Sequence, residues 1–166
     1  MSQSSNELNQ RNRLLIWILW GLLALGVATD IAIGLPMEII IVLITVGGIF
    51  SGAATWMAYT KKLRYYVKYV IPFGLTSIVS VLILSDPEPV VSTYFLTYVS
   101  MAIVALYSDY RPIVLTGVLG AVMTTYIFLD EEIQQRIFPN DELVFLYLYL
   151  LFATVALCIA AVFAER

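Results

Sequence analysis

Apolar runs of about 20 residues, separated by short polar segments, constrain this chain of 166 residues more than any other feature. A bilayer core about 30 Å thick needs ~20 mostly apolar residues per spanning helix. Without the alternation of a membrane β-strand, a helix is the remaining way to satisfy the backbone in lipid. We therefore predict an all-α, polytopic membrane protein with six transmembrane helices. The expected spans are residues 14–34, 37–59, 65–85, 89–107, 112–129 and 143–163.

The distribution of charged residues predicts the orientation of these spans. Of the nine Lys and Arg residues, eight lie in the N-terminal tail, in or beside the second and fourth connections, or at the C-terminal end. Arg136 lies in the opposite loops together with most of the acids. Because Lys and Arg accumulate on the cytoplasmic side, we place both termini, including the tail of residues 1–13, in the cytoplasm. The six helices would then form three hairpins that face outward.

Each expected outer loop combines acids with proline, as in "SDPEPVV" and "LDEEIQQRIFPNDELV". Proline and acids are favoured in the first turn of a helix, so helix capping and topology explain most of this pattern. The alternative is an acidic outer vestibule that attracts cations, protons or a basic ligand. The segment "DEEIQQRIF" is expected to form a short interfacial helix and is the outer region best suited to meet a partner.

Several classes of function are disfavoured by what the sequence lacks. The chain has no histidine, and its one cysteine, Cys158, lies in an apolar run. No lysine is expected at mid-depth, so nothing activates a nucleophile in the usual ways. We expect no enzyme activity, no metal or cofactor and no nucleic-acid partner, although a membrane enzyme using the outer carboxylates stays open. The expected surroundings are the lipid bilayer.

Hydroxylic and small residues inside the spans supply the candidate sites. Such residues either let helices pack closely and hydrogen-bond or line a polar cavity. If a cavity exists, we expect ligand contacts from five residues: Tyr94, Thr97, Tyr98, Thr124 and, near the outer end of the first span, Asp30. Gly48 and Gly52 form a pair that suits a close contact between helices.

The stretch "YSDYRPIV" is expected to be a tight cytoplasmic turn between the fourth and fifth spans. Asp109 can cap the next helix, and Pro112 is suited to its first turn. Arg111 would lie on the same side of the membrane as the end of the sixth span. We therefore assign Asp109 and Arg111 a candidate role in signal relay.

Three segments carry a resemblance to a known family. "GLPMEIIIVLITVGGI", "YSDYRPIVLTGVLG" and "FPNDELVFLYLYLLFATVALC" resemble the amino-terminal six-helix membrane region of Gram-positive methyl-accepting chemotaxis proteins. The resemblance covers the chain from about residue 12. It implies residues 14–166 as a transmembrane sensor domain in the bacterial cell membrane, part of a longer receptor. It also implies a homodimer, for which the face with Gly48 and Gly52 is a candidate interface.

The resemblance implies that the sixth helix relays a stimulus to a cytoplasmic signalling module, which binds a kinase and its coupling protein. Related sensor regions precede histidine kinases and diguanylate cyclases, so the type of output module stays open. A small transporter or channel subunit is the main alternative, and a purely structural or assembly protein is a third. The outer loops are short, so the stimulus is not specified.

Overall fold

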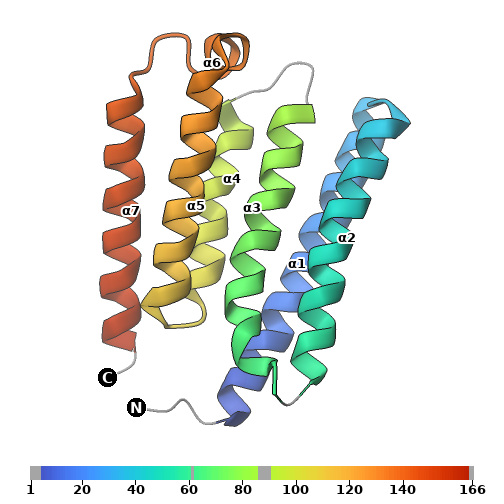
Figure 1. Ribbon diagram of the computed structural model, residues 1–166, viewed down its shortest axis with the longest axis vertical. Coiled ribbons are helices and arrows are strands. Elements are labelled where there is room, and N and C mark those ends of the chain that lie inside the picture. Colours follow the sequence, from blue (N-terminus) through green and yellow to red (C-terminus); the bar gives the residue numbers. More distant parts are fainter. Residues whose placement is uncertain (1–4, 61, 86–90, 165–166) are drawn as a thin grey trace. The chain divides into compact units, whose positions relative to one another are not determined.

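The computed structural model describes residues 5–60, 62–85 and 91–164, and all regular secondary structure in these residues is helical. The all-α prediction is therefore confirmed for this part of the chain. The helices are α1 (Ser5–Ile33), α2 (Met37–Tyr59), the 3-10 helix η1 (Arg64–Tyr66), α3 (Val67–Ser85), α4 (Val91–Ala105), α5 (Tyr110–Leu129), α6 (Glu131–Ile137) and α7 (Leu143–Ala164). Figure 1 shows them in chain order.

Five of the described helices are long and apolar enough to cross a membrane: Glu7–Ile33, Met37–Tyr59, Arg64–Leu84, Tyr110–Leu129 and Leu143–Ala164. They agree closely with five predicted spans, except that α1 begins at Ser5, before the expected start at residue 14. The fourth predicted span, 89–107, corresponds to α4, which has 15 residues. That length is below the ~17–25 residues of an ordinary span, so α4 is not confirmed as one. Residues 86–90 lie outside the described residues.

The chain divides into two compact units, Met1–Ile78 (unit 1) and Val79–Arg166 (unit 2), with the boundary inside α3. In unit 1, α1 and α2 form an antiparallel hairpin (Figure 1). The turn uses Gly34 at φ 82°, a conformation that favours glycine, and its N–H donates to the Asp30 carbonyl at 3.1 Å. Leu23 of α1 lies against Gly47 of α2, and both helices bury leucines: Leu15, Leu19, Leu23 and Leu43 are each at most 5% exposed.

Close approach of α1 and α2 depends on Gly47. A Cβ atom there would collide with the Leu23 side chain, whereas a Cβ at Gly48 or Gly52 would meet no heavy atom within 4 Å. The predicted pair Gly48 and Gly52 therefore makes no close contact between helices within the described chain. Its suggested use in a homodimer stays a prediction.

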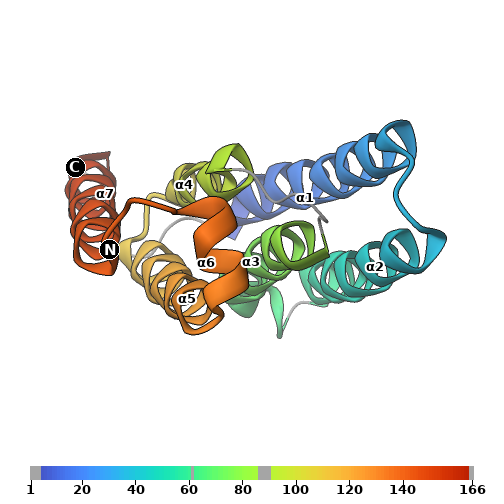
Figure 2. The same cartoon turned by 90° about the horizontal axis from the view of Figure 1, so that it is seen from above.

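In unit 2, helix α5 contacts α4, α6 and α7. Figure 2 shows α4 and α7 beside α5, with the short α6 at its end. Gly117 lies against Thr154 of α7, and a Cβ at Gly120 would lie 3.0 Å from the Thr97 Cγ2 atom of α4. Small residues thus bring two neighbours close to α5.

Helix α6 confirms the expected short helix after the fifth span. Asp130 caps it, because the Asp130 carboxylate accepts hydrogen bonds from the N–H groups of Glu132 and Ile133 at 3.1 and 3.2 Å. Arg136 and Glu132, which are one turn apart on its exposed face, form an ion pair. Its last residue, Ile137, is fully buried. Helix α6 therefore packs against the core of unit 2 through its last residue.

Candidate functional site

A buried hydrogen bond joins α4 to α5 in unit 2. The hydroxyls of Tyr94 and Thr124 are 2.7 Å apart, and the two side chains are 1% and 0% exposed. Thr124 also donates to the Gly120 carbonyl at 2.8 Å, which leaves Tyr94 as the donor in the bond between helices. Two residues that the sequence predicted as ligand contacts are therefore direct partners.

The other two predicted ligand contacts in α4 lie beside this bond. The Tyr98 ring meets the Tyr94 ring edge to face, with centroids 6.0 Å apart. Thr97 is 4% exposed, and its hydroxyl has no hydrogen-bond partner among the described residues. A buried hydroxyl without a partner costs free energy. Thr97 is accordingly the place in this cluster where a polar ligand group or a water molecule would gain most.

The segment after α6 packs against the cluster. The Phe138 ring packs edge to face on Tyr94, with ring centroids 4.9 Å apart, and stacks on Phe128 at 5.9 Å. Phe138 is only 2% exposed. Because α6 and Phe138 form one connected segment, movement of α6 would change the surroundings of Tyr94. We call Tyr94, Thr97, Tyr98, Thr124 and Phe138 the hydroxyl cluster.

Helix α7 is tied to the helix that carries the cluster. The hydroxyls of Thr125 and Tyr147 lie 2.5 Å apart, one residue along α5 from Thr124. Two turns earlier in α5, Gly117 packs against Thr154 of α7. These contacts between α5 and α7 were not predicted from the sequence. The available signal was that Thr125 and Tyr147 are residues with hydroxyl groups inside apolar runs.

The turn between α4 and α5 also touches α7. Asp109 caps α5 as predicted, since its carboxylate accepts a hydrogen bond from the Arg111 N–H at 3.0 Å. The Arg111 guanidinium lies 5.8 Å from the Tyr110 ring centroid. The Cys158 thiol of α7 is 3.8 Å from the Tyr110 carbonyl oxygen. The two proposed relay residues therefore flank a residue that contacts the last helix.

Asp30, the fifth predicted ligand contact, belongs to unit 1. It is 4% exposed and lies near the C-terminal end of α1, where its backbone carbonyl accepts hydrogen bonds from the N–H groups of Gly34 and Leu35. The structure therefore brings together Tyr94, Thr97, Tyr98 and Thr124 within unit 2, whereas Asp30 belongs to unit 1. Among the described residues, no group of three or more His, Cys, Asp or Glu residues could hold a metal ion.

Comparison with known protein families, curated proteins and solved structures finds no match for this chain.

Proposed function

We propose that this chain is a membrane-embedded sensory input domain of a bacterial signal-transduction receptor. In this proposal the six apolar helices form three outward-facing hairpins, and both termini lie in the cytoplasm of a bacterial cell. The observation that carries the proposal is that α5 holds the buried Thr124 of the hydroxyl cluster and also packs on α7. The cluster would receive the stimulus, and α7 would transmit it.

The contacts suggest how such a domain would switch. A ligand that hydrogen-bonds Thr97 or replaces the bond between Tyr94 and Thr124 would favour a different spacing of α4 and α5. Because Thr125 and Gly117 tie α5 to α7, a change at α5 would shift or rotate α7. The contact between Cys158 and the Tyr110 carbonyl would carry the same change to the turn with Asp109 and Arg111.

The contacts in unit 2 favour this function over a small transporter or channel subunit. An ion-coupled pathway usually places an ionisable group inside the bundle, and the hydroxyl cluster contains only hydroxyl and aromatic side chains. Transport predicts that the reconstituted protein moves a solute, and that replacing Asp30 changes the flux. A sensor domain predicts no flux with either protein.

The coding sequence beyond Arg166 tests the proposal directly. A reading frame that continues into heptad-patterned sequence, as in a chemoreceptor, a histidine kinase or a diguanylate cyclase, supports a sensor domain. A stop codon at this point contradicts it. A homodimer and a coupled kinase belong to the same proposal, and crosslinking across the face with Gly48 and Gly52 tests the dimer.

A further inference from the structure

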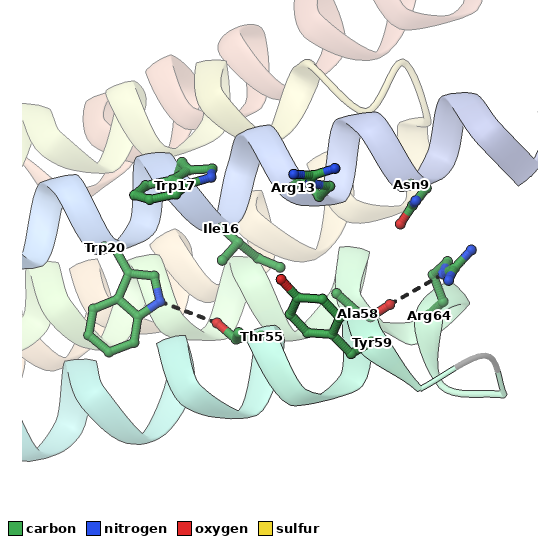
Figure 3. Close-up of a pocket in the computed structure, with 9 residues that line it drawn as sticks. All are labelled: Asn9, Arg13, Ile16, Trp17, Trp20, Thr55, Ala58, Tyr59 and Arg64. Carbon is green, nitrogen blue, oxygen red and sulfur yellow. Dashed lines mark hydrogen bonds between the residues drawn. The ribbon is translucent and has the colours of Figure 1, made fainter.

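A pocket in unit 1 lies between α1, the end of α2 and η1, apart from the residues assigned a role above (Figure 3). Its volume is about 580 Å³. That volume falls within the range of ~300–1,000 Å³ of small-molecule sites. It is lined by Asn9, Arg13, Ile16, Trp17, Trp20, Thr55, Ala58, Tyr59 and Arg64.

The lining changes from charged to apolar along α1. Asn9, Arg13, Trp17 and Trp20 follow one another at helical spacing along one side of the helix (Figure 3). Arg64 of η1 lies near the Asn9 end, so the guanidinium groups of Arg13 and Arg64 both line the polar half of the pocket. The tryptophans occupy the other half, where the apolar span begins. A molecule that fits this order is an amphiphile with an anionic head.

The arginines are placed to receive an anion. The Arg64 Nε–H donates to the Ala58 carbonyl at 3.3 Å, which leaves its two terminal amino groups available. In the described part of the chain, no carboxylate forms a salt bridge with Arg13 or Arg64. Fully buried Asn12 donates to the Arg64 carbonyl at 3.0 Å and so fixes η1 against α1. The polar end is therefore held in place by α1 itself.

The aromatic end offers a surface for a hydrocarbon chain. Trp20 is oriented by a hydrogen bond from its Nε1 to the Thr55 hydroxyl at 3.2 Å. Trp17 is 75% exposed and Tyr59 is 81% exposed, so both present apolar surface to the surroundings of unit 1. Tryptophan and tyrosine prefer the headgroup level of a bilayer, and Arg13 marks the start of the apolar span at that level.

We propose that this pocket binds one anionic phospholipid, with its phosphate between Arg13 and Arg64 and one acyl chain along Trp17 and Trp20. Arginine recognises phosphate through paired N–H donors. With two arginines and no acid in the lining, the polar end of the site has no carboxylate to pair with the ammonium of a zwitterionic headgroup, and the tryptophans lie at the end that the acyl chain would occupy. The pocket therefore favours a lipid with net negative charge over phosphatidylcholine.

Native mass spectrometry of the purified full chain, titrated with phosphatidylglycerol or phosphatidylcholine in detergent, tests the proposal. We expect saturable binding of one phosphatidylglycerol and weaker binding of phosphatidylcholine. Each basic residue near a membrane surface contributes about fivefold to anionic lipid affinity, so Arg13→Gln should weaken binding about fivefold and the double variant Arg13→Gln/Arg64→Gln about 30-fold. The single variant leaves the Arg64 contact with Ala58 intact.

A matched control removes the same charge from residues outside the pocket. Arg11→Gln/Lys62→Gln lowers the net charge equally, and neither residue lines the pocket. This control should change the affinity less than threefold. Equal weakening by both double variants would overturn the proposal, because it would show general attraction to a basic surface. Displacement of the lipid by an equal concentration of inorganic phosphate would also overturn it, because a free anion would then suffice.

Discussion

The two units differ in where the hydrogen bonds between side chains of neighbouring helices lie. In unit 2, hydroxyl pairs between helices lie in the interior, as in the bond between Tyr94 and Thr124. In unit 1, the side-chain hydrogen bond between α1 and α2 joins Trp20 to Thr55 and is exposed. The interior of that hairpin is mainly apolar, with Leu23 packed on Gly47. It also buries the polar side chains of Asn12, Asp30 and Ser51.

This difference indicates separate tasks. Without a hydrophobic driving force between helices in lipid, buried hydrogen bonds and small residues determine which helices meet. Under the proposed function, the buried hydroxyl pair of unit 2 is the contact that a ligand would replace. The hairpin of unit 1 has a mainly apolar interior, in which the polar side chains of Asn12, Asp30 and Ser51 are also buried. Its hydrogen bond between Trp20 and Thr55 is exposed. The variants below test this contrast.

The largest expected effect comes from filling the contact between α5 and α7. Gly117→Leu would push against Thr154, and overpacking of this kind costs about 2–3 kcal/mol. Gly21→Leu is the matched control, because a Cβ atom there meets nothing within 4 Å and the residue lies outside the candidate dimer face. Unfolding in detergent by SDS titration measures both variants. Equal losses would show that the contact between α5 and α7 is not tight.

The buried hydroxyl pair should give the next largest effect. Tyr94→Phe and Thr124→Val should each lower the free energy of unfolding by about 1–2 kcal/mol, and the double variant by less than the sum. Thr55→Val removes the exposed bond to Trp20 in unit 1, and we expect a loss below about 0.5 kcal/mol. The same titration measures all four variants. A larger loss for Thr55→Val would reverse the contrast between the units.

Removal of the cap of α5 should have a smaller effect. Asp109→Ala loses the acceptor for the Arg111 N–H and should cost about 0.5–1 kcal/mol. Asp109→Asn keeps an acceptor at this position and should restore most of the stability. If Asp109→Asn is as unstable as Asp109→Ala, the carboxylate charge and not the cap accounts for the loss.

Arg111→Ala should have the smallest effect on stability. The Arg111 side chain is exposed and contacts Tyr110, so we expect unchanged insertion and a loss within about 0.5 kcal/mol. In a full-length receptor the same variant should alter signalling, because the turn contacts α7 through Tyr110. Unchanged signalling would reduce this stretch to a connecting turn.

The sequence predicted those features that depend on local chemistry. Apolar runs located five long helices, and the cap by Asp109 follows from a short acceptor directly before a helix. Tyr94 and Thr124 were grouped because side chains with hydroxyl groups inside apolar runs form hydrogen bonds between helices or line a polar cavity. The structure places the two hydroxyls 2.7 Å apart, while their role in ligand binding stays a prediction.

Features that depend on tertiary contacts were harder to predict. Periodicity did not show that Gly47, and not the neighbouring Gly48, faces α1, because adjacent positions differ only by the rotation of the helix. The fourth run appeared long enough for a span, but α4 ends at Ala105, and Ser108 adopts a φ of 52° in the turn that follows. The pocket was missed because Arg13 and Trp17 were each explained separately, by topology and by interfacial anchoring.

The proposed function requires that the hydroxyl cluster is coupled to α7. Spin labels at Val118→Cys on α5 and Ala160→Cys on α7, in a Cys158→Ala background, report their separation by pulsed electron resonance. Both positions are exposed. Adding Tyr94→Phe and Thr124→Val should shift or broaden the distance distribution between the labels. A distribution that stays the same while stability falls would contradict the claim, because the cluster would then only support the fold.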